Sequence, residues 1–233
     1  MHHVYPYAVY ACGDHAFTLD FGEHIDVNIN RYVIRIFHHI KATPLPYILD
    51  IIPAYSSITI VYDIPAMANL SSKPEMVIHE CFENAMQQIE NDAIPESGNI
   101  IRIPVCYHPS VAPDLEALCQ LHQINTDTLI DLHTQKTYRV FMNGFLPGFA
   151  YLGSVDERIA TPRHTTPRQQ VAAGSVGIAG FQTGIYPFES PGGWQIIGRT
   201  TLSLFDLSSD NPCLLKPGDQ VQFYSIPLAS FSV

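Results

Sequence analysis

Apolar residues in the first part of the chain follow two periods, one typical of strands and one typical of helices. Phe17, Leu19 and Phe21 alternate with polar neighbours, as in a strand with one buried face. Val33 and Phe37 instead recur at the spacing of one helix face. The elements predicted in this way are strands within 7–21, a helix over 26–41, strands over 48–52 and 57–62, and a helix over 74–90. The order β-β-α-β-β-α is typical of a small α+β domain.

A polar, turn-rich segment, DAIPESGN at residues 92–99, follows the second predicted helix. Segments of this kind commonly connect domains. We therefore expect two domains, a small α+β domain over residues 1–93 and a second domain over residues 94–233.

The second domain changes from helical to strand-like patterning along its length. Its first predicted elements are a strand over 100–107 and short helices over 114–122 and 126–133. After Thr137, short apolar runs alternate with glycine and proline turns, and in the last strand Val221 and Phe223 share a face. Many short strands at turn spacing predict a closed or nearly closed β-barrel, so this domain should be mainly β.

Glycine is concentrated between Tyr138 and Leu204. Ten of the fourteen glycines lie from Gly144 to Gly198, and the only tryptophan, Trp194, lies among them. Glycine is needed where φ is positive or where backbone closely approaches another group, so this stretch should contain tight turns. We expect Trp194 in the core or at an interface, with a ligand-binding surface as the alternative.

Composition and charge narrow the class of protein. The 233 residues are 46% apolar and 15% charged, which indicates an ordered protein with a sizeable core. A formal net charge of −10 argues against a nucleic-acid binder, whose surface should be basic. No apolar run reaches the roughly 20 residues that span a bilayer, and the N-terminus does not resemble a signal peptide. The five cysteines form no C-x-x-C pair, so we expect reduced thiols and a cytoplasmic protein, with Cys81 and Cys119 buried on helix faces.

Familiar catalytic motifs are missing from the sequence. The glycines at 174, 177, 180 and 184 precede no Lys-Ser or Lys-Thr pair, and their spacing fits neither a P-loop nor G-x-G-x-x-G. There is no G-x-S-x-G elbow and no H-E-x-x-H, and the eleven histidines do not cluster at ligand spacing. We therefore expect no metal site, and the sequence reveals no nucleotide site on this chain.

Arginines in the glycine-rich stretch are candidates for anion binding. Residues 141–205 carry four arginines, no lysine and three acids. Arg163 and Arg168 lie in ATPRHTTPR, where each preceding proline restricts the backbone and holds the guanidinium on a stiff loop. Guanidinium forks suit carboxylate or phosphate partners. The spacing is equally consistent with contact to a partner protein or with ion pairs to acids drawn from Asp156, Glu157 and Glu189.

Other polar residues lie in the same apolar frame. They are His133, Gln182, Thr183, Tyr186, Glu189 and Arg199. His133 is a candidate acid or base because the pKa of free imidazole lies near neutrality. A structural histidine is the equal alternative.

Four motifs, in this order, resemble the family of 5-oxoprolinase B subunits, which is also called KipI-like or allophanate hydrolase subunit 1. They are GFLPGFAYLG (144–153), TPRHTTPR (161–168), AGSVGIAGFQTGIYP (173–187) and SPGGWQIIGRT (190–200). Weaker likeness covers nearly all of the remaining chain, including IPVCY at residues 103–107.

The resemblance implies a cyclophilin-like β-barrel behind a small α+β domain, in agreement with the hydrophobic pattern. It also implies a protein that is inactive alone and pairs with the C subunit of 5-oxoprolinase, a partner of homologous fold. Together with the A subunit, the complex would cleave 5-oxo-L-proline to L-glutamate at the expense of ATP. Two other branches of the family stay open: an inhibitor of a sensor histidine kinase, and a carboxyltransferase-type component of a urea carboxylase or allophanate hydrolase system. The latter would require a biotin-bearing partner.

The oxoprolinase branch suggests roles for seven residues. We expect one substrate-derived anion to be held by Arg163, Arg168 and Arg199, with Tyr186 beside them. The catalytic candidates are His133, Gln182 and Glu189. The sequence departs from the family pattern at 108–113, where the family usually has glycines and an acid before Asp114-Leu115. It departs again at Phe181, which replaces a usual glycine and should add bulk beside the pocket.

Overall fold

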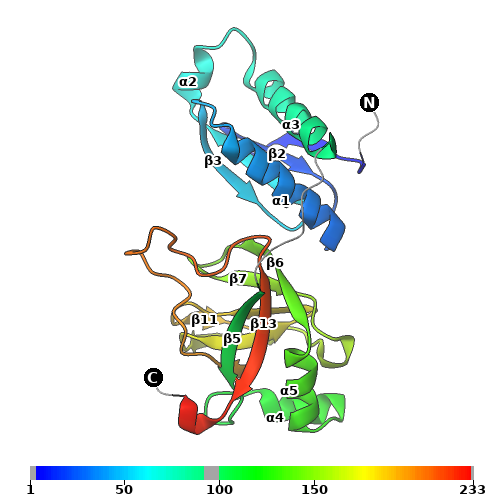
Figure 1. Cartoon of the computed structure of the whole chain (residues 1–233), viewed down its shortest axis with the longest axis vertical. Helices are drawn as coiled ribbons and strands as arrows, with labels where there is room; N and C mark the ends of the chain where they lie inside the picture. The colour runs from blue at the N-terminus through cyan, green and yellow to red at the C-terminus, as the bar shows by residue number, and fades with distance from the viewer. Residues whose placement is uncertain (1–3, 92–99, 232–233) are drawn as a thin grey trace. The chain divides into compact units, whose positions relative to one another are not determined.

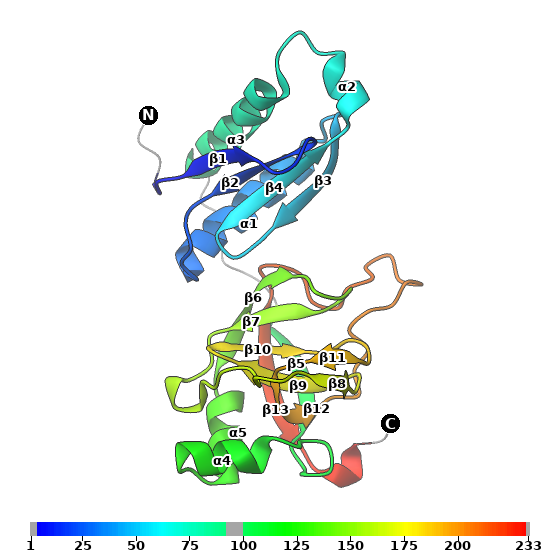
Figure 2. The same ribbon diagram turned by 180° about the vertical axis from the view of Figure 1, so that it is seen from behind.

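The computed structural model describes residues 4–91 and 100–231. The chain divides into two compact units, Met1–Ser97 and Gly98–Val233, which Figures 1 and 2 show from opposite sides. The domain boundary predicted at 92–99 lies outside the described residues. The predicted fold class, an α+β unit followed by a mainly β barrel, is confirmed.

The first unit is a four-stranded antiparallel sheet with α1 and α3 on one of its faces (Figures 1 and 2). Its elements are β1 (Ala8–Ala11), β2 (Ala16–Asp20), α1 (Val27–Ala42), β3 (Ile48–Pro53), β4 (Ser57–Tyr62), α2 (Ile64–Ala68) and α3 (Pro74–Asn91). The strand order is β1-β2-β4-β3. The predicted strands and the two long helices are present, and α2 is an additional helix. Its five residues are too few to show a helical period.

The buried positions of this unit follow the periods seen in the sequence. Ile58, Ile60 and Tyr62 form the inner face of β4, and Val33 of α1 packs against the same core. The start of α1 is fixed by Asp26, whose carboxylate accepts hydrogen bonds from the backbone N–H groups of residues 28 and 29 at 2.7 and 2.9 Å. These bonds satisfy two of the donors that a helix N-terminus leaves open.

The second unit is a closed seven-stranded barrel with a separate two-stranded ribbon. Its strands are β5 (Ile100–Cys106), β6 (Thr137–Asn143), β7 (Ala150–Gly153), β8 (Arg168–Val171), β9 (Ser175–Ala179), β10 (Gln182–Ile185), β11 (Ser190–Gly192), β12 (Gln195–Arg199) and β13 (Gln220–Ile226). The barrel order is β10-β7-β6-β13-β5-β12-β9, and β8 pairs with β11 in the ribbon. Closure gives every barrel strand two neighbours and leaves no unpaired edge.

The first and last strands of the barrel lie side by side. β5 and β13 pair in parallel along their whole length, from Ile100 opposite Gln220 to Cys106 opposite Ile226, and the other barrel pairs are antiparallel. Val221 and Phe223 are buried on one face of β13, as predicted. This pairing closes the barrel by joining segments more than a hundred residues apart in the sequence.

Two helices, α4 (Leu115–His122) and α5 (Thr126–Thr134), lie at one end of the barrel (Figures 1 and 2). Leu115, Leu118, Leu129 and Leu132 are buried in the barrel core, so the predicted apolar faces are confirmed. The two helices therefore plug this end of the barrel with side chains.

Close backbone packing explains part of the glycine content. Gly174 has a φ of +80°, and a Cβ there would lie 2.1 Å from the carbonyl oxygen of Thr200. No side chain fits such a position. The glycine at 174 therefore serves a tight approach of backbone, as the sequence predicts, and not a phosphate-binding loop.

All five cysteines are unpaired in the structure. Cys119 is buried as predicted, while Cys81 is half-buried, and burial raises the pKa of the Cys81 thiol to about 11. A thiol with a raised pKa stays protonated at neutral pH and is a weak nucleophile.

Candidate functional site

The structure divides the predicted site residues among separate places. One cavity, which we call the aromatic pocket, is lined by Arg163 and Tyr186, and another, which we call the arginine cleft, is lined by Arg168 and Arg199. The two cavities share no lining residue. The structure thus places Arg163 in a different cavity from Arg168 and Arg199, and the binding of one anion by all three arginines stays a prediction.

The aromatic pocket has a volume of about 230 Å³. Its lining residues are Phe145, Phe149, Tyr151, Arg163, Pro167, Tyr186, Pro191, Gly192, Gly193 and Trp194. The ring of Phe149 meets those of Trp194 and Tyr186 edge to face, with centroids 5.4 and 5.3 Å apart. These rings hold one another in place and give the pocket flat apolar walls. Trp194, 4% exposed, belongs both to the core and to the wall of this pocket.

Arg163 lies at the exposed rim of the aromatic pocket. Its guanidinium carbon is 5.8 Å from the centroid of the Trp194 ring, a cation–π contact. The loop that carries Arg163 is held by one hydrogen bond on each side of this residue. The side-chain amide of Gln195 donates to the Pro162 carbonyl at 2.9 Å, and the backbone N–H of His164 donates to the Gly193 carbonyl at 2.7 Å. Within the described residues Arg163 has no ion pair. A fixed guanidinium without a carboxylate partner is suited to an anionic ligand.

Tyr186 contributes a buried hydroxyl to the same pocket. Burial raises the pKa of this phenol, so its oxygen stays protonated at neutral pH. A Cβ at Gly192 would lie 2.3 Å from this oxygen, so only glycine fits there. Among the described residues the Tyr186 proton has no acceptor, which leaves one donor for a ligand.

The arginine cleft has a volume of about 220 Å³. Its lining residues are Ser110, Val111, Pro113, Arg168, Gln170, Val171, Ala172, Ser175, Ile196 and Arg199. Three of them come from the segment 108–113, where the sequence departs from the family pattern. The divergent segment therefore lies at the arginine cleft and contributes no residue to the lining of the aromatic pocket. Arg199 also borders a neighbouring cavity of about 280 Å³, whose wall includes residues 200–203.

Asp114 organises the arginine cleft, and the sequence analysis did not select it. Its carboxylate is 4% exposed and accepts hydrogen bonds from Arg168 Nη2 at 2.5 Å and from the backbone N–H of Ile196 at 2.6 Å. His164 Nε2 lies 3.3 Å from the same carboxylate. The available signal was Asp-Leu at 114–115, which keeps the family pattern directly after the divergent segment.

The ion pairs of the arginines differ from those considered for Arg163 and Arg168 in the sequence. Arg168 pairs with Asp114, which lies 54 residues away in the sequence, and Asp156 pairs with Arg158 at 2.9 Å. The Arg158 pair spans two residues and is on the surface, with the Arg158 side chain 62% exposed. The partner of Arg168 is therefore an acid that was not considered, and Asp156 pairs with its own neighbour in the sequence.

His133 lies in the barrel core and not in either cavity. It is fully buried, and its ring stacks on Phe223 with centroids 4.6 Å apart. Thr183 donates its hydroxyl proton to the Gly177 carbonyl at 2.9 Å, so its oxygen accepts from His133 Nε2–H at 3.0 Å. The Tyr107 hydroxyl then donates to His133 Nδ1 at 2.7 Å. This chain of hydrogen bonds holds a neutral imidazole, which supports the structural alternative and corrects the grouping of His133 with the arginines.

The buried His133 should make the stability of the barrel depend on pH. Desolvation lowers the pKa of His133 from 6.5 to about 3. Between these pH values the unfolded chain binds a proton that the folded chain excludes, so stability is lost as the pH falls below 6.5. We expect the free energy of unfolding to fall by about 2 kcal/mol from this group between pH 7 and pH 5. Urea unfolding followed by the fluorescence of Trp194 measures it.

His133→Gln provides the control for this pH effect. Because the variant has no imidazole at this position, its loss of stability between pH 7 and pH 5 should be smaller than that of the unchanged protein. The pH slopes are compared, not the absolute stabilities, since the substitution also removes core contacts. Equal slopes in the two proteins would contradict the assignment of a buried neutral histidine.

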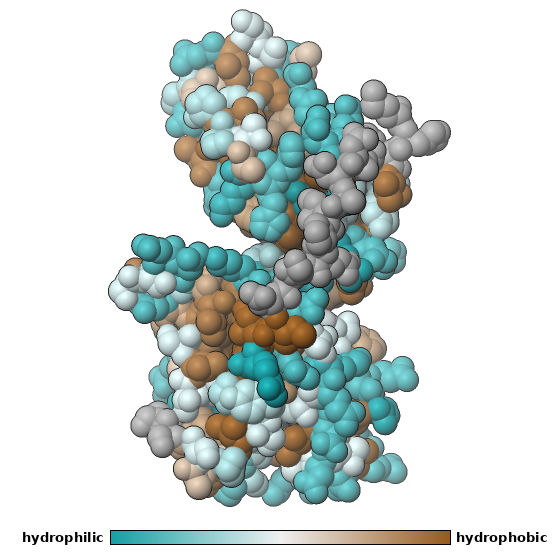
Figure 3. Space-filling model, in the orientation of Figure 1, coloured by the Kyte–Doolittle hydropathy of each residue, from teal (hydrophilic) through white to brown (hydrophobic). Residues whose placement is uncertain are grey.

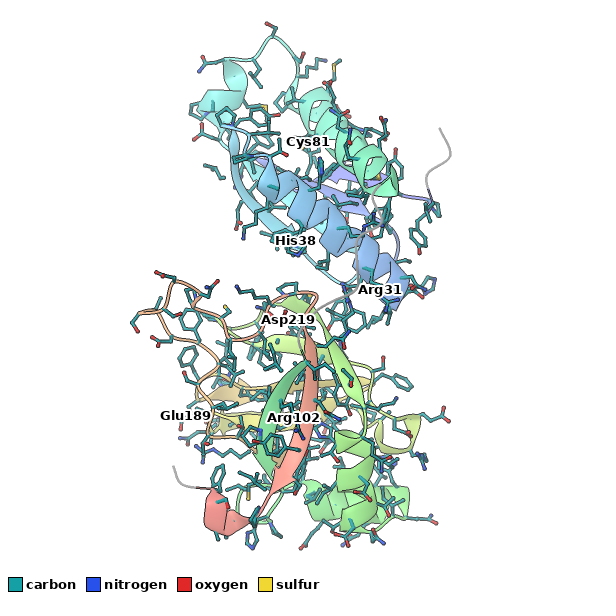
Figure 4. The ribbon with its side chains drawn as sticks, viewed as in Figure 1. Arg31, His38, Cys81, Arg102, Glu189 and Asp219 are labelled. Atoms are coloured by element: carbon teal, nitrogen blue, oxygen red, sulfur yellow. The ribbon has the colours of Figure 1, made fainter. Side chains whose placement is uncertain are left out.

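Gln182 and Glu189 line neither cavity. Gln182 is half-buried at the start of β10, and Glu189 is exposed in the turn before β11 (Figure 4). Phe181 is 59% exposed and is absent from the lining of the aromatic pocket, so its bulk does not narrow that pocket. The β9–β10 turn at Gly180-Phe181 directs the chain outward at this point.

Two further searches concern the described residues only. Over 4–91 and 100–231, no three His, Cys, Asp or Glu side chains gather in a way that could hold a metal ion. In the same residues no helix has the length and apolar character required to cross a membrane.

The sequence of this chain is similar to those of known proteins. Residues 7–215 match the family model described as carboxyltransferase domain, subdomain C and D, which defines the class of protein. The chain is 40% identical over 225 residues to the 5-oxoprolinase B subunit of Bacillus subtilis (strain 168), covering 94% of this chain and 93% of the relative. It is 36% identical over 215 residues to the 5-oxoprolinase B subunit of Escherichia coli O157:H7, covering 92% and 94%. The chain belongs to the family of 5-oxoprolinase B subunits.

Solved structures and a more distant relative agree with this class. TTHA0988 superposes with a TM-score of 0.78 at 32% identity over 91% of this chain, which spans 40% of that longer chain. A conserved uncharacterized protein from Pyrococcus horikoshii superposes with a TM-score of 0.56 at 39% identity, covering 97% of this chain and 100% of that one. Urea amidolyase of Saccharomyces cerevisiae is 24% identical over 254 residues, covering 95% of this chain and 13% of the amidolyase.

Proposed function

We propose that this chain is the B subunit of an ATP-dependent 5-oxoprolinase, which opens 5-oxo-L-proline to L-glutamate. The observation that carries the proposal is the end-to-end match to two 5-oxoprolinase B subunits, at 40% and 36% identity. The aromatic pocket is the part of the chain whose chemistry suits that substrate.

The aromatic pocket and 5-oxoproline are complementary in shape and charge. The substrate is a flat five-membered lactam that carries one carboxylate. Its ring would lie against the walls of Trp194 and Phe149, and its carboxylate would meet the guanidinium of Arg163. The protonated Tyr186 hydroxyl would donate to the lactam carbonyl oxygen. These contacts bind and orient the lactam and place a donor where negative charge develops.

Opening the lactam needs its carbonyl carbon to be activated, because an unstrained amide is a poor electrophile. ATP, as a second substrate, can phosphorylate the lactam oxygen with release of ADP. Water then adds to the activated carbon, the C–N bond breaks to free the amine, and a second water hydrolyses the resulting acyl phosphate to L-glutamate and phosphate. The sequence contains no P-loop, so the nucleotide binds either to a partner subunit or at a site of unfamiliar form. The present chain then contributes the pocket that holds the lactam.

Exposed apolar residues on the barrel unit suit contact with the C and A subunits of the complex. Leu202, Leu207 and Leu214 are 37%, 82% and 40% exposed on the long segment between β12 and β13, which extends from the barrel in Figure 1. Figure 3 shows further apolar surface beside the start of β5, where Ile100 is 51% exposed. Groups of exposed apolar residues of this kind often mark protein interfaces.

The function is tested by reconstitution. We expect 5-oxoproline-dependent ATP hydrolysis and release of glutamate when this chain is mixed with the A and C subunits, and none with this chain alone. Omission of each component in turn is the control. An assembled three-component complex that releases no glutamate would overturn the proposed function.

The urea carboxylase branch is the second candidate. It is supported by the match of 95% of this chain to the yeast urea amidolyase. A carboxyltransferase of that kind would move a carboxyl group between biotin and urea and would need a biotin-bearing partner. Biotin-dependent carboxylation of urea by the same reconstituted mixture, without cleavage of 5-oxoproline, would favour this branch.

A further inference from the structure

The arginine cleft differs in chemistry from the aromatic pocket. Its wall contains two guanidiniums, from Arg168 and Arg199, the hydroxyls of Ser110 and Ser175, and the amide of Gln170, but no aromatic ring. All of these groups can donate hydrogen bonds. The cleft is therefore equipped for a ligand rich in acceptor oxygens, whereas the aromatic pocket is equipped for a ring.

Ser175 gives the first sign of a missing ligand. The residue is 4% exposed and lines the cleft, yet its hydroxyl has no hydrogen-bond partner within residues 4–91 and 100–231. It lies directly opposite Arg199 in the antiparallel pairing of β9 with β12, so the two side chains lie on the same face of the sheet. The hydroxyl is open to the cleft, so an acceptor oxygen bound there can take its proton.

Arg168 gives the second sign. Its Nη2 is held by Asp114, while its Nη1 is buried and has no hydrogen-bond partner among the described residues. Arg199 is held in a similar way, because its Nε donates to the Ala173 carbonyl at 2.7 Å. Each guanidinium is thus held in place through one of its nitrogen atoms. Counting Asp114, the local charge is about +1, which favours an anion.

We propose that the arginine cleft binds a phosphoryl group. Its donors come from three strands, β8, β9 and β12, and therefore approach from several directions. A tetrahedral phosphoryl group has three free oxygens that can accept from all of them, whereas a planar carboxylate has two. The phosphoryl group belongs either to a nucleotide or to an acyl phosphate formed from the substrate. The identity of the molecule that carries the phosphoryl group rests on the proposed function, whereas the binding of a phosphoryl group does not.

The test is equilibrium binding of inorganic phosphate to the isolated full-length chain by calorimetry, at constant ionic strength. We expect saturable binding of one phosphate. Ser175→Ala should weaken it about 10-fold, the lower end for one hydrogen bond to a charged group, and Arg199→Gln up to about 150-fold, because it also removes a positive charge. Ser175→Ala should fold normally because the hydroxyl it removes has no partner to lose.

The matched control is Arg102→Gln. Arg102 lies on β5 (Figure 4), its guanidinium carbon is 5.2 Å from the Tyr224 ring centroid, and it lines neither cavity. This variant should bind phosphate as tightly as the unchanged chain. Three results would each overturn the proposal. They are no binding of phosphate, Ser175 and Arg199 variants that bind phosphate as tightly as the unchanged chain, and acetate binding as tightly as phosphate.

Two further titrations identify the source of the phosphoryl group. Tighter binding of acetyl phosphate than of ATP assigns the cleft to an acyl phosphate, and the reverse assigns it to the terminal phosphate of a nucleotide. Because the assay uses this chain alone, its result does not depend on the other two subunits. Phosphate binding without oxoprolinase activity would support the phosphoryl site and overturn the proposed function. Oxoprolinase activity without phosphate binding would support the proposed function and overturn the phosphoryl site.

Discussion

Arg163→Ala should lower the turnover of 5-oxoproline by the reconstituted complex about 10- to 150-fold, with assembly of the complex unchanged. The expected loss corresponds to about 1.5–3 kcal/mol, the contribution of one charged hydrogen bond. Arg163 is exposed, stacks on Trp194 and has no ion pair within the described residues, so its removal leaves no buried charge unpaired. The measurement is glutamate release at saturating ATP, as a function of 5-oxoproline concentration.

Arg102→Ala is the matched control for this loss. It also removes an exposed arginine that stacks on an aromatic ring, in this case Tyr224, but it does not line the aromatic pocket. Its turnover should equal that of the unchanged complex. If the Arg163 variant turns over 5-oxoproline at the normal rate while assembled, the aromatic pocket is not the substrate site.

Asp114→Ala should lower the free energy of unfolding of the barrel unit by about 3 kcal/mol. Removing one partner of a buried ion pair typically costs about 3–5 kcal/mol, and the lower value applies because the Arg168 side chain keeps 33% exposure to water. The substitution also leaves the buried N–H of Ile196 without its acceptor. Urea unfolding followed by the fluorescence of Trp194, the only tryptophan, reports on this unit alone.

Asp156→Ala is the control for a pair of the same chemistry on the surface. It breaks the ion pair with Arg158, whose side chain is 62% exposed. Exposed pairs are screened by water and salt, so this variant should lose much less stability than Asp114→Ala. Equal losses in the two variants would show that Asp114 does not organise the cleft.

The same two residues illustrate how far the sequence reaches. Arg163 could be selected from its place in ATPRHTTPR, because proline restricts the neighbouring backbone and this effect is local. Asp114 could not be assigned to Arg168, because the two residues are 54 positions apart and meet only when β8 is in place. Likewise, the exposed surroundings of Phe181 depend on the β9–β10 turn and not on its neighbours in sequence.

The sequence by itself determined the order of the elements and the two fold classes. The alternation in β4 and the helical period of α1 indicate which face of each element is buried, because apolar residues recur where side chains face the core. Only the tertiary structure decided the closure of the barrel by β5 and β13, the division of the arginines between two cavities and the burial of His133. These features depend on contacts between distant segments, and the amino-acid pattern within one segment carries no information about which distant segment it meets.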